Sequence, residues 1–81
     1  IKVNSEYSTS DGRIDLVFHL PKLIYVSEVK FNKPPDQAIA QIKERGYYKP
    51  FLALGKPVVL LGVSFLREPH HFDVEVQEEK L

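Results

Sequence analysis

Two strand-like runs separated by Pro21-Lys22 constrain the fold of this chain more than any other feature. Residues 13–20 and 23–31 are rich in Val, Ile, Leu, Phe and Tyr, and the proline between them is typical of a turn. We therefore expect an antiparallel hairpin. Counting back from the turn places Asp15 opposite or nearly opposite Glu28, and directly opposed side chains lie about 5 Å apart.

One more strand is expected before this hairpin. Residues 1–8 have a strand-like pattern, and Ser10-Asp11-Gly12 follows them. Asp-Gly is a strong signal for a tight turn between antiparallel strands. The first three strands should therefore form an antiparallel meander.

After Pro34-Pro35 the pattern changes to that of a helix. Prolines suit a first helical turn, which has backbone N–H groups without partners, and apolar or small residues then recur at helical spacing. These inward-facing positions are Ala38, Ile39, Ile42 and Gly46. We expect the helix to begin at Asp36 and to end near Gly46.

Two strands are expected after the helix. The nearly continuous apolar run 58–65 is typical of a buried strand, whereas residues 72–77 alternate in polarity. The segment between the third and fourth strands is long enough to join them in parallel. The fold class is therefore α+β, or mixed α/β, and residues 78–81 should form a charged tail that frays.

The composition limits the chain to one small domain. It has 81 residues, of which 43% are hydrophobic, and it has no cysteine, which excludes disulfides and thiolate metal sites. Because no apolar stretch is long enough to cross a bilayer and no leader pattern opens the chain, we expect a cytoplasmic location and no membrane contact.

The strands bring together residue types that suit phosphodiester hydrolysis. Asp15 lies at the start of one expected strand, and Glu28 and Lys30 project from one face of the next because they are two positions apart. Magnesium takes oxygen ligands and often needs only one or two carboxylates beside a substrate phosphate. A nearby ammonium can orient the attacking water or stabilise negative charge at phosphorus.

The same residues resemble the PD-(D/E)XK nuclease superfamily, with Ile14 in the place of the proline. Gly12-Arg13-Ile14-Asp15, then Glu28-Val29-Lys30, then Gln41 and Tyr47 are similar to the RecB-like branch. A larger set that adds Glu6, Ala38, Ile42 and Gly62-Val63-Ser64-Phe65 resembles the nuclease-like domain found behind an AAA-type ATPase domain in many bacterial proteins. The resemblance covers nearly the whole chain.

The resemblance implies a restriction-endonuclease-like core and a metal-dependent nuclease, acting on DNA, with Mg²⁺ or Mn²⁺ as cofactor. It implies three groups of site residues: catalytic Asp15, Glu28, Lys30 and Gln41; metal-binding Asp15, Glu28 and Glu6; and nucleic-acid-binding Arg13, Lys33 and Tyr47. Members of this superfamily usually carry a helix before the first strand. The chain opens directly on a strand at Ile1, so we expect a single domain over residues 1–81 that is a fragment without this helix.

Other interpretations stay open at this point. Glu28 and Lys30 would also suit an exposed cross-strand ion pair, and Glu6 would suit an exposed strand position. The net charge of zero is unusual for a nucleic-acid-binding domain, so a nuclease fold without catalysis, coupled to an ATPase, is the main alternative. A third possibility is an oligomerisation domain. His70-His71 favours a solvated turn over a metal site, since adjacent side chains point apart.

Overall fold

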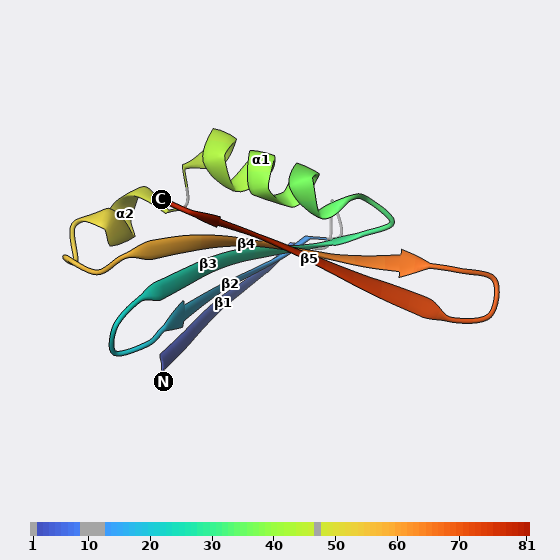
Figure 1. Cartoon of the computed structure of the whole chain (residues 1–81), viewed down its shortest axis with the longest axis horizontal. Coiled ribbons are helices and arrows are strands. Elements are labelled where there is room, and N and C mark those ends of the chain that lie inside the picture. The colour runs from blue at the N-terminus through green and yellow to red at the C-terminus, as the bar shows by residue number, and fades with distance from the viewer. Residues whose placement is uncertain (1, 9–12, 47) are drawn as a thin grey trace.

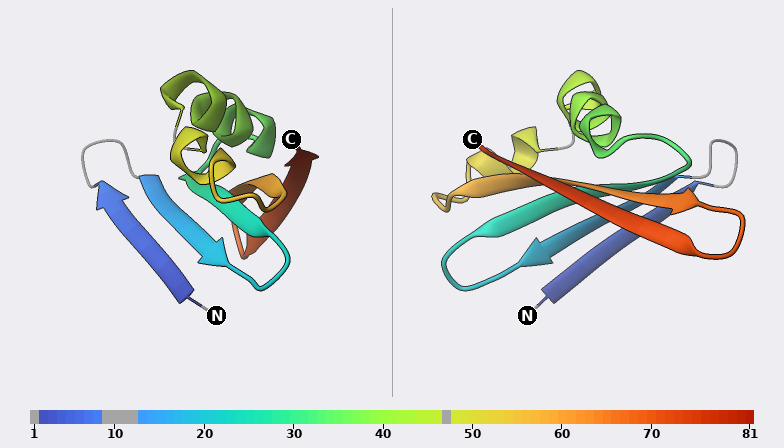
Figure 2. Two further views of the ribbon diagram at one scale, coloured as in Figure 1. Left: turned by 90° about the vertical axis from the view of Figure 1, so that its left-hand side faces the viewer. Right: turned by 45° about the vertical axis from the view of Figure 1, so that its right-hand side comes forward.

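The protein folds into one five-stranded sheet with both helices on the same side of it (Figures 1 and 2). The computed structural model describes residues 2–8, 13–46 and 48–81, with side chains described for 15–46 and 48–81. The other face of the sheet carries no helix from the described part of the chain. The molecule is elongated, with extents of 44 × 23 × 20 Å.

Strand order follows the chain, and one pair of neighbours is parallel. The order is β1-β2-β3-β4-β5, and only β3 and β4 run in parallel. The elements are β1 (Lys2–Ser8), β2 (Arg13–His19), β3 (Ile24–Phe31), α1 (Pro35–Arg45), α2 (Lys49–Leu52), β4 (Val58–Arg67) and β5 (Phe72–Lys80). The expected meander, crossover helix and two further strands are confirmed, and the α+β class with them.

The turn at Pro21-Lys22 sets the register of the central hairpin. The N–H of Leu20 donates to the carbonyl of Leu23 at 2.9 Å across this turn. From there the antiparallel pairing runs without interruption, and it brings Asp15 opposite Glu28, as the sequence predicts.

Helix α1 begins and ends where its residues require. Pro34 is the N-cap and Pro35 the first helical residue, where a missing N–H costs no hydrogen bond. At the other end Gly46 has a φ of 70°, a left-handed conformation that favours glycine, and its N–H donates to the carbonyl of Ile42. Gly46 is therefore the C-cap of the helix, not part of its packed face.

The hydrophobic core lies between α1 and the strands β3 and β4. Its buried side chains come from all three elements: Ile24, Val26, Ile39, Ile42, Val58 and Leu60. Tyr48 and Phe51, from the segment after α1, are partly buried and pack against this core. No helix of the described residues is long and apolar enough to cross a membrane.

Two features differ from the sequence-based expectations. Residues 78–80 were expected to fray, but β5 continues to Lys80 and the N–H of Leu81 donates to the carbonyl of Val58 at 3.0 Å. This prediction was wrong because β4 offers a pairing partner along its whole length. The short helix α2 was not expected, and the predicted turn at Ser10-Asp11-Gly12 lies outside the described residues.

Candidate active site

Residues that pair directly across neighbouring strands form a row across the sheet, and this row contains the candidate carboxylates. Asp15 of β2 pairs with Glu28 of β3, and Glu28 pairs with Gly62 of β4. On the other side of Asp15 the register places Glu6 of β1. Residues that are directly opposed on neighbouring strands share a face of the sheet. The row therefore brings together three positions that the sequence predicted as metal ligands.

Glu28 and Lys30 form an ion pair on the helix-covered face, in which Glu28 is buried and Lys30 is mostly covered. The Glu28 side chain is 0% exposed and that of Lys30 is 14% exposed, and Lys30 Nζ lies 3.7 Å from Glu28 Oε2. A solvent-exposed ion pair is thus excluded, because the Glu28 carboxylate is buried. Removing a carboxylate from water costs several kcal/mol, which the neighbouring ammonium offsets only in part. Such an expensive arrangement is typical of a functional site.

Gly62 explains how Glu28 becomes buried beside a helix. A Cβ atom at Gly62 would lie 2.3 Å from the carbonyl oxygen of Pro35 and 3.0 Å from Cγ1 of Ile39. Only a glycine lets the first turn of α1 approach the sheet so closely. Since Glu28 is the neighbour of Gly62 on β3, the same approach covers the carboxylate.

Ser64 ties the end of β3 to β4 next to Lys30. Its buried hydroxyl donates to the backbone carbonyl of Lys33, in the loop that leads to α1. The N–H of Arg67 donates to Oδ1 of Asn32 in the same loop at 2.9 Å. Lys30 pairs with Ser64 across the two strands. The end of β3 that carries Lys30 is therefore fixed in position by side-chain hydrogen bonds.

Gln41 of α1 presents a buried oxygen whose hydrogen bonding is incomplete. Its Oε1 atom is buried and accepts no hydrogen bond from the part of the chain that the structure describes. A buried acceptor without a donor costs about 1–3 kcal/mol. A bound water or a substrate group would supply the donor, which supports a functional role for Gln41.

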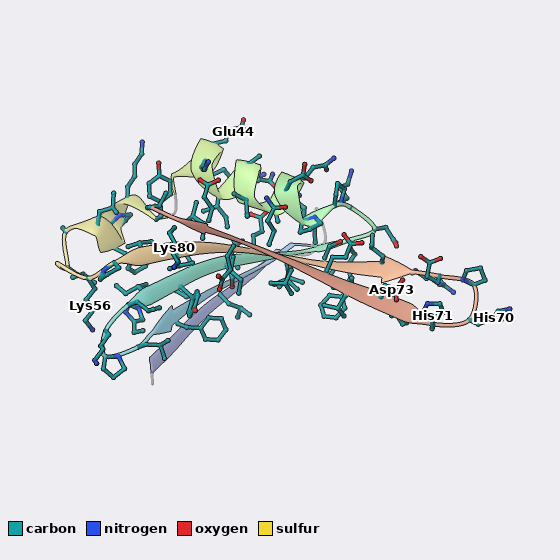
Figure 3. All side chains as sticks on the ribbon, in the orientation of Figure 1. Glu44, Lys56, His70, His71, Asp73 and Lys80 are labelled. Carbon is teal, nitrogen blue, oxygen red and sulfur yellow. The ribbon has the colours of Figure 1, made fainter. Side chains whose placement is uncertain are left out.

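A pocket of about 250 Å³ lies between α1 and Lys30. Its lining residues are Lys30, Gln37, Ala40, Gln41 and Glu44, and the four helical ones follow the spacing of a single helix face. Figure 3 shows Glu44 on the outer side of α1. The sequence reasoning missed Gln37 and Glu44. Helical spacing from Gln41, one turn back and one turn forward, would have found them.

The predicted nucleic-acid contacts are placed only in part. Lys33 is exposed in the loop after β3, close to the strand end that carries Lys30. Arg13 and Glu6 lie in strands, but their side chains are outside the described residues, as is the whole of Tyr47. Lys43 points to β5, where it forms an ion pair with Glu79.

The donor set suits a hard divalent cation. Asp15 Oδ1 and both carboxylate oxygens of Glu28 are buried, and the two residues are directly opposed. Among the residues with described side chains, no group of three His, Cys, Asp or Glu residues could hold a metal. Mg²⁺ that also contacts phosphates is usually held by one or two carboxylates, so the residues present fit this ion.

His71 lies away from these carboxylates, at the tip of the β4–β5 hairpin, where its Nε2 is 3.4 Å from Oδ1 of Asp73 (Figure 3).

Comparison with known families agrees with this geometry. A model of the PD-(D/E)XK nuclease superfamily matches residues 1–74, which include every predicted site residue. The chain belongs to the PD-(D/E)XK nuclease superfamily. Its mixed sheet and crossover helix are those of the restriction-endonuclease-like fold. Superfamily membership suggests nuclease activity on a nucleic acid with a divalent metal.

One curated relative is similar over most of this PD-(D/E)XK chain. It is an uncharacterized protein in the vnfD 5'region of Azotobacter chroococcum mcd 1, with 39% identity over 70 residues. The match covers 84% of this chain and 14% of the relative, so the chain spans about one seventh of the relative's length. No solved structure matches significantly.

Proposed function

We propose that this chain is the catalytic domain of a metal-dependent nuclease that hydrolyses phosphodiester bonds in DNA. The observation that carries the proposal is the cluster of Asp15, Glu28 and Lys30 on adjacent strands, beside a pocket and with the Glu28 carboxylate fully buried. A domain that only bound a partner would gain little stability from a fully buried carboxylate.

Each residue has a role that follows from its position. Asp15 and Glu28 would hold Mg²⁺ or Mn²⁺, with Glu6 as a third candidate ligand from the next strand. When bound, the ion supplies Lewis-acid chemistry: it acidifies a water and neutralises charge on the phosphate. Lys30 orients the attacking water with its ammonium and stabilises the negative charge that develops on the phosphate oxygens.

Gln41 and the pocket would position the substrate. The Gln41 amide nitrogen donates to a phosphate oxygen, and its buried Oε1 accepts from the attacking water. Gln37 lies one helical turn earlier on the same pocket wall and donates to the adjacent phosphate. Lys33, exposed beside the end of β3, attracts the backbone of the nucleic acid, as do Arg13 and Tyr47 in this proposal.

The experiment is a cleavage assay on supercoiled plasmid and on linear single-stranded and double-stranded DNA, with RNA as the competing substrate class. We expect cleavage of DNA with Mg²⁺ or Mn²⁺ and none with EDTA. Lys30→Ala should lower the rate about 100-fold or more, because it removes a charge that stabilises the transition state. Lys22→Ala, at the exposed turn on the other end of the hairpin, is the matched control and should cleave like wild type.

A nuclease fold without catalysis is the competing function. It predicts DNA binding without cleavage, and equal behaviour of wild type and Lys30→Ala. The RecB-like affiliation and an AAA-type ATPase domain in the same protein stay predictions of the sequence resemblance. The match with this chain covers only 14% of the relative, which leaves room for further domains in the relative.

A further inference from the structure

Strand β5 forms an open edge of the sheet. It is the last strand in the order and pairs only with β4 among the described strands. Eight of its nine residues are exposed, and the pairing with β4 runs without a bulge from Val59–Lys80 to Arg67–Phe72. Proteins normally shield such edges with prolines, bulges or short strands, because a bare edge can pair with another chain. β5 is long and has neither a proline nor a bulge, so its charged side chains are the protection that its own sequence gives this edge.

The hydrogen bonds at both ends of the β4–β5 hairpin show which backbone groups face outward. The N–H of Leu81 donates to Val58, and the N–H of Glu68 donates to His71. In an antiparallel ladder, hydrogen-bonded residues alternate with residues whose backbone groups point away. Odd-numbered β5 residues therefore bond to β4. Phe72, Val74, Val76 and the other even-numbered residues direct their N–H and C=O groups to the open edge.

The two faces of β5 differ in chemistry. Phe72, Val74 and Val76 are 67%, 55% and 59% exposed, and they lie on the face opposite the helices. Gln77 pairs with Gly62, against which α1 packs, so the odd-numbered residues of β5 lie on the helix-covered face. Most of these residues are acidic. The acidic residues of this face are Asp73, Glu75 and Glu79.

A second copy of β5 is a poor partner for this edge. Outward-facing residues must pair with each other in an antiparallel dimer, so the two-fold axis passes near Val74, Glu75 or Val76. These registers place Asp73 opposite Glu75, Glu75 opposite itself, or Asp73 opposite Glu79, respectively. Like charges that are directly opposed destabilise a sheet.

We propose that the β5 edge binds an extended peptide segment in which apolar residues alternate with lysine or arginine. The segment adds a sixth strand through the outward backbone groups of Phe72, Val74 and Val76. Its apolar side chains cover this exposed apolar row, and its cations lie beside Asp73 and Glu75. The inference concerns the open edge of the sheet, two strands away from Glu28, and is independent of the nuclease proposal.

The test uses a fluorescein-labelled peptide of alternating lysine and valine, as long as β5, and an alternating glutamate and valine peptide as the comparison. We expect saturable anisotropy with the lysine peptide only. Hydrogen exchange should slow at the amides of Val74 and Val76 but change little at Glu75, which already bonds to β4. Equal binding of both peptides, or protection elsewhere in the sheet, would overturn the proposal.

Two variants make the test specific. Val74→Pro removes one outward N–H without removing a β4–β5 hydrogen bond, and should weaken the lysine peptide about tenfold. Glu75→Lys keeps the edge intact and should weaken the lysine peptide while strengthening the glutamate peptide. Unchanged affinity in Glu75→Lys would contradict the proposal even if Val74→Pro did not fold. Concentration-dependent dimerisation that Glu75→Lys promotes would assign the edge to a second copy instead.

Discussion

Glu28 and Gly62 lie directly opposite each other on the parallel strands β3 and β4. The missing side chain of Gly62 lets the carbonyl of Pro35 approach the sheet, and the helix that follows covers the Glu28 carboxylate. The glycine thus links the packing of α1 to the burial of a candidate metal ligand.

Gly62→Ala tests this link. The added Cβ would lie 2.3 Å from a backbone oxygen, so α1 must shift, and such overpacking typically costs about 1–3 kcal/mol. We expect denaturant unfolding to show this loss and the affinity for Mn²⁺ to fall as well. The control is Gly55→Ala, where a Cβ meets no atom but the φ of 76° is unfavourable for alanine. It should lose stability without losing metal affinity. A Gly62→Ala protein with wild-type stability would contradict the role of this close contact.

Gln41→Leu should separate stability from activity. Leucine removes a buried amide oxygen that accepts no hydrogen bond from the described residues, so the free energy of unfolding should stay the same or rise by about 1 kcal/mol. DNA cleavage should fall by about tenfold or more, since both the hydrogen bond to the phosphate and the one from the attacking water are lost. Urea unfolding and single-turnover cleavage measure the two effects. A strong loss of stability would show that Gln41 has a structural role instead.

Glu28→Gln should remove the response of thermal stability to metal. An ion that binds only the folded state at 100 times its Kd adds about 2.7 kcal/mol, which raises the Tm of a domain this small by roughly 15 °C. We expect Mn²⁺ to raise the Tm of wild type, and EDTA to reverse the rise. Glu28→Gln should show no rise, whereas Glu78→Gln, on the exposed strand β5, should behave like wild type. An equal rise in all three proteins would place the ion elsewhere.

Much of this site was predictable because local signals determine it. The turn at Pro21-Lys22 sets the register of β2 and β3, so the opposition of Asp15 and Glu28 follows from counting residues. The parallel pairing of β3 and β4 follows from the length of the crossover. Burial was less accessible to sequence reasoning: an i, i+2 pair such as Glu28 and Lys30 has the same pattern whether water or a helix covers it.

The remaining differences depend on tertiary contacts. Glu79 has the sequence signature of a solvated tail, but β4 pairs with it and Lys43 of α1 neutralises it. Gln37 and Glu44 have the polarity of any exposed helix face, and only the position of Lys30 across the pocket distinguishes them. β5 has the sequence alternation of a half-buried strand, whereas both of its faces are exposed, including the apolar one.

The most direct test of the account is calorimetric titration of the chain with Mn²⁺, comparing wild type with Asp15→Ala and with Asp36→Ala. Asp36 is exposed in the first turn of α1 and serves as the matched aspartate control. We predict that wild type and Asp36→Ala bind the ion and that Asp15→Ala, folded by circular dichroism, does not. If wild type binds no ion, or Asp15→Ala binds it as tightly as wild type, Asp15 and Glu28 are not the metal site.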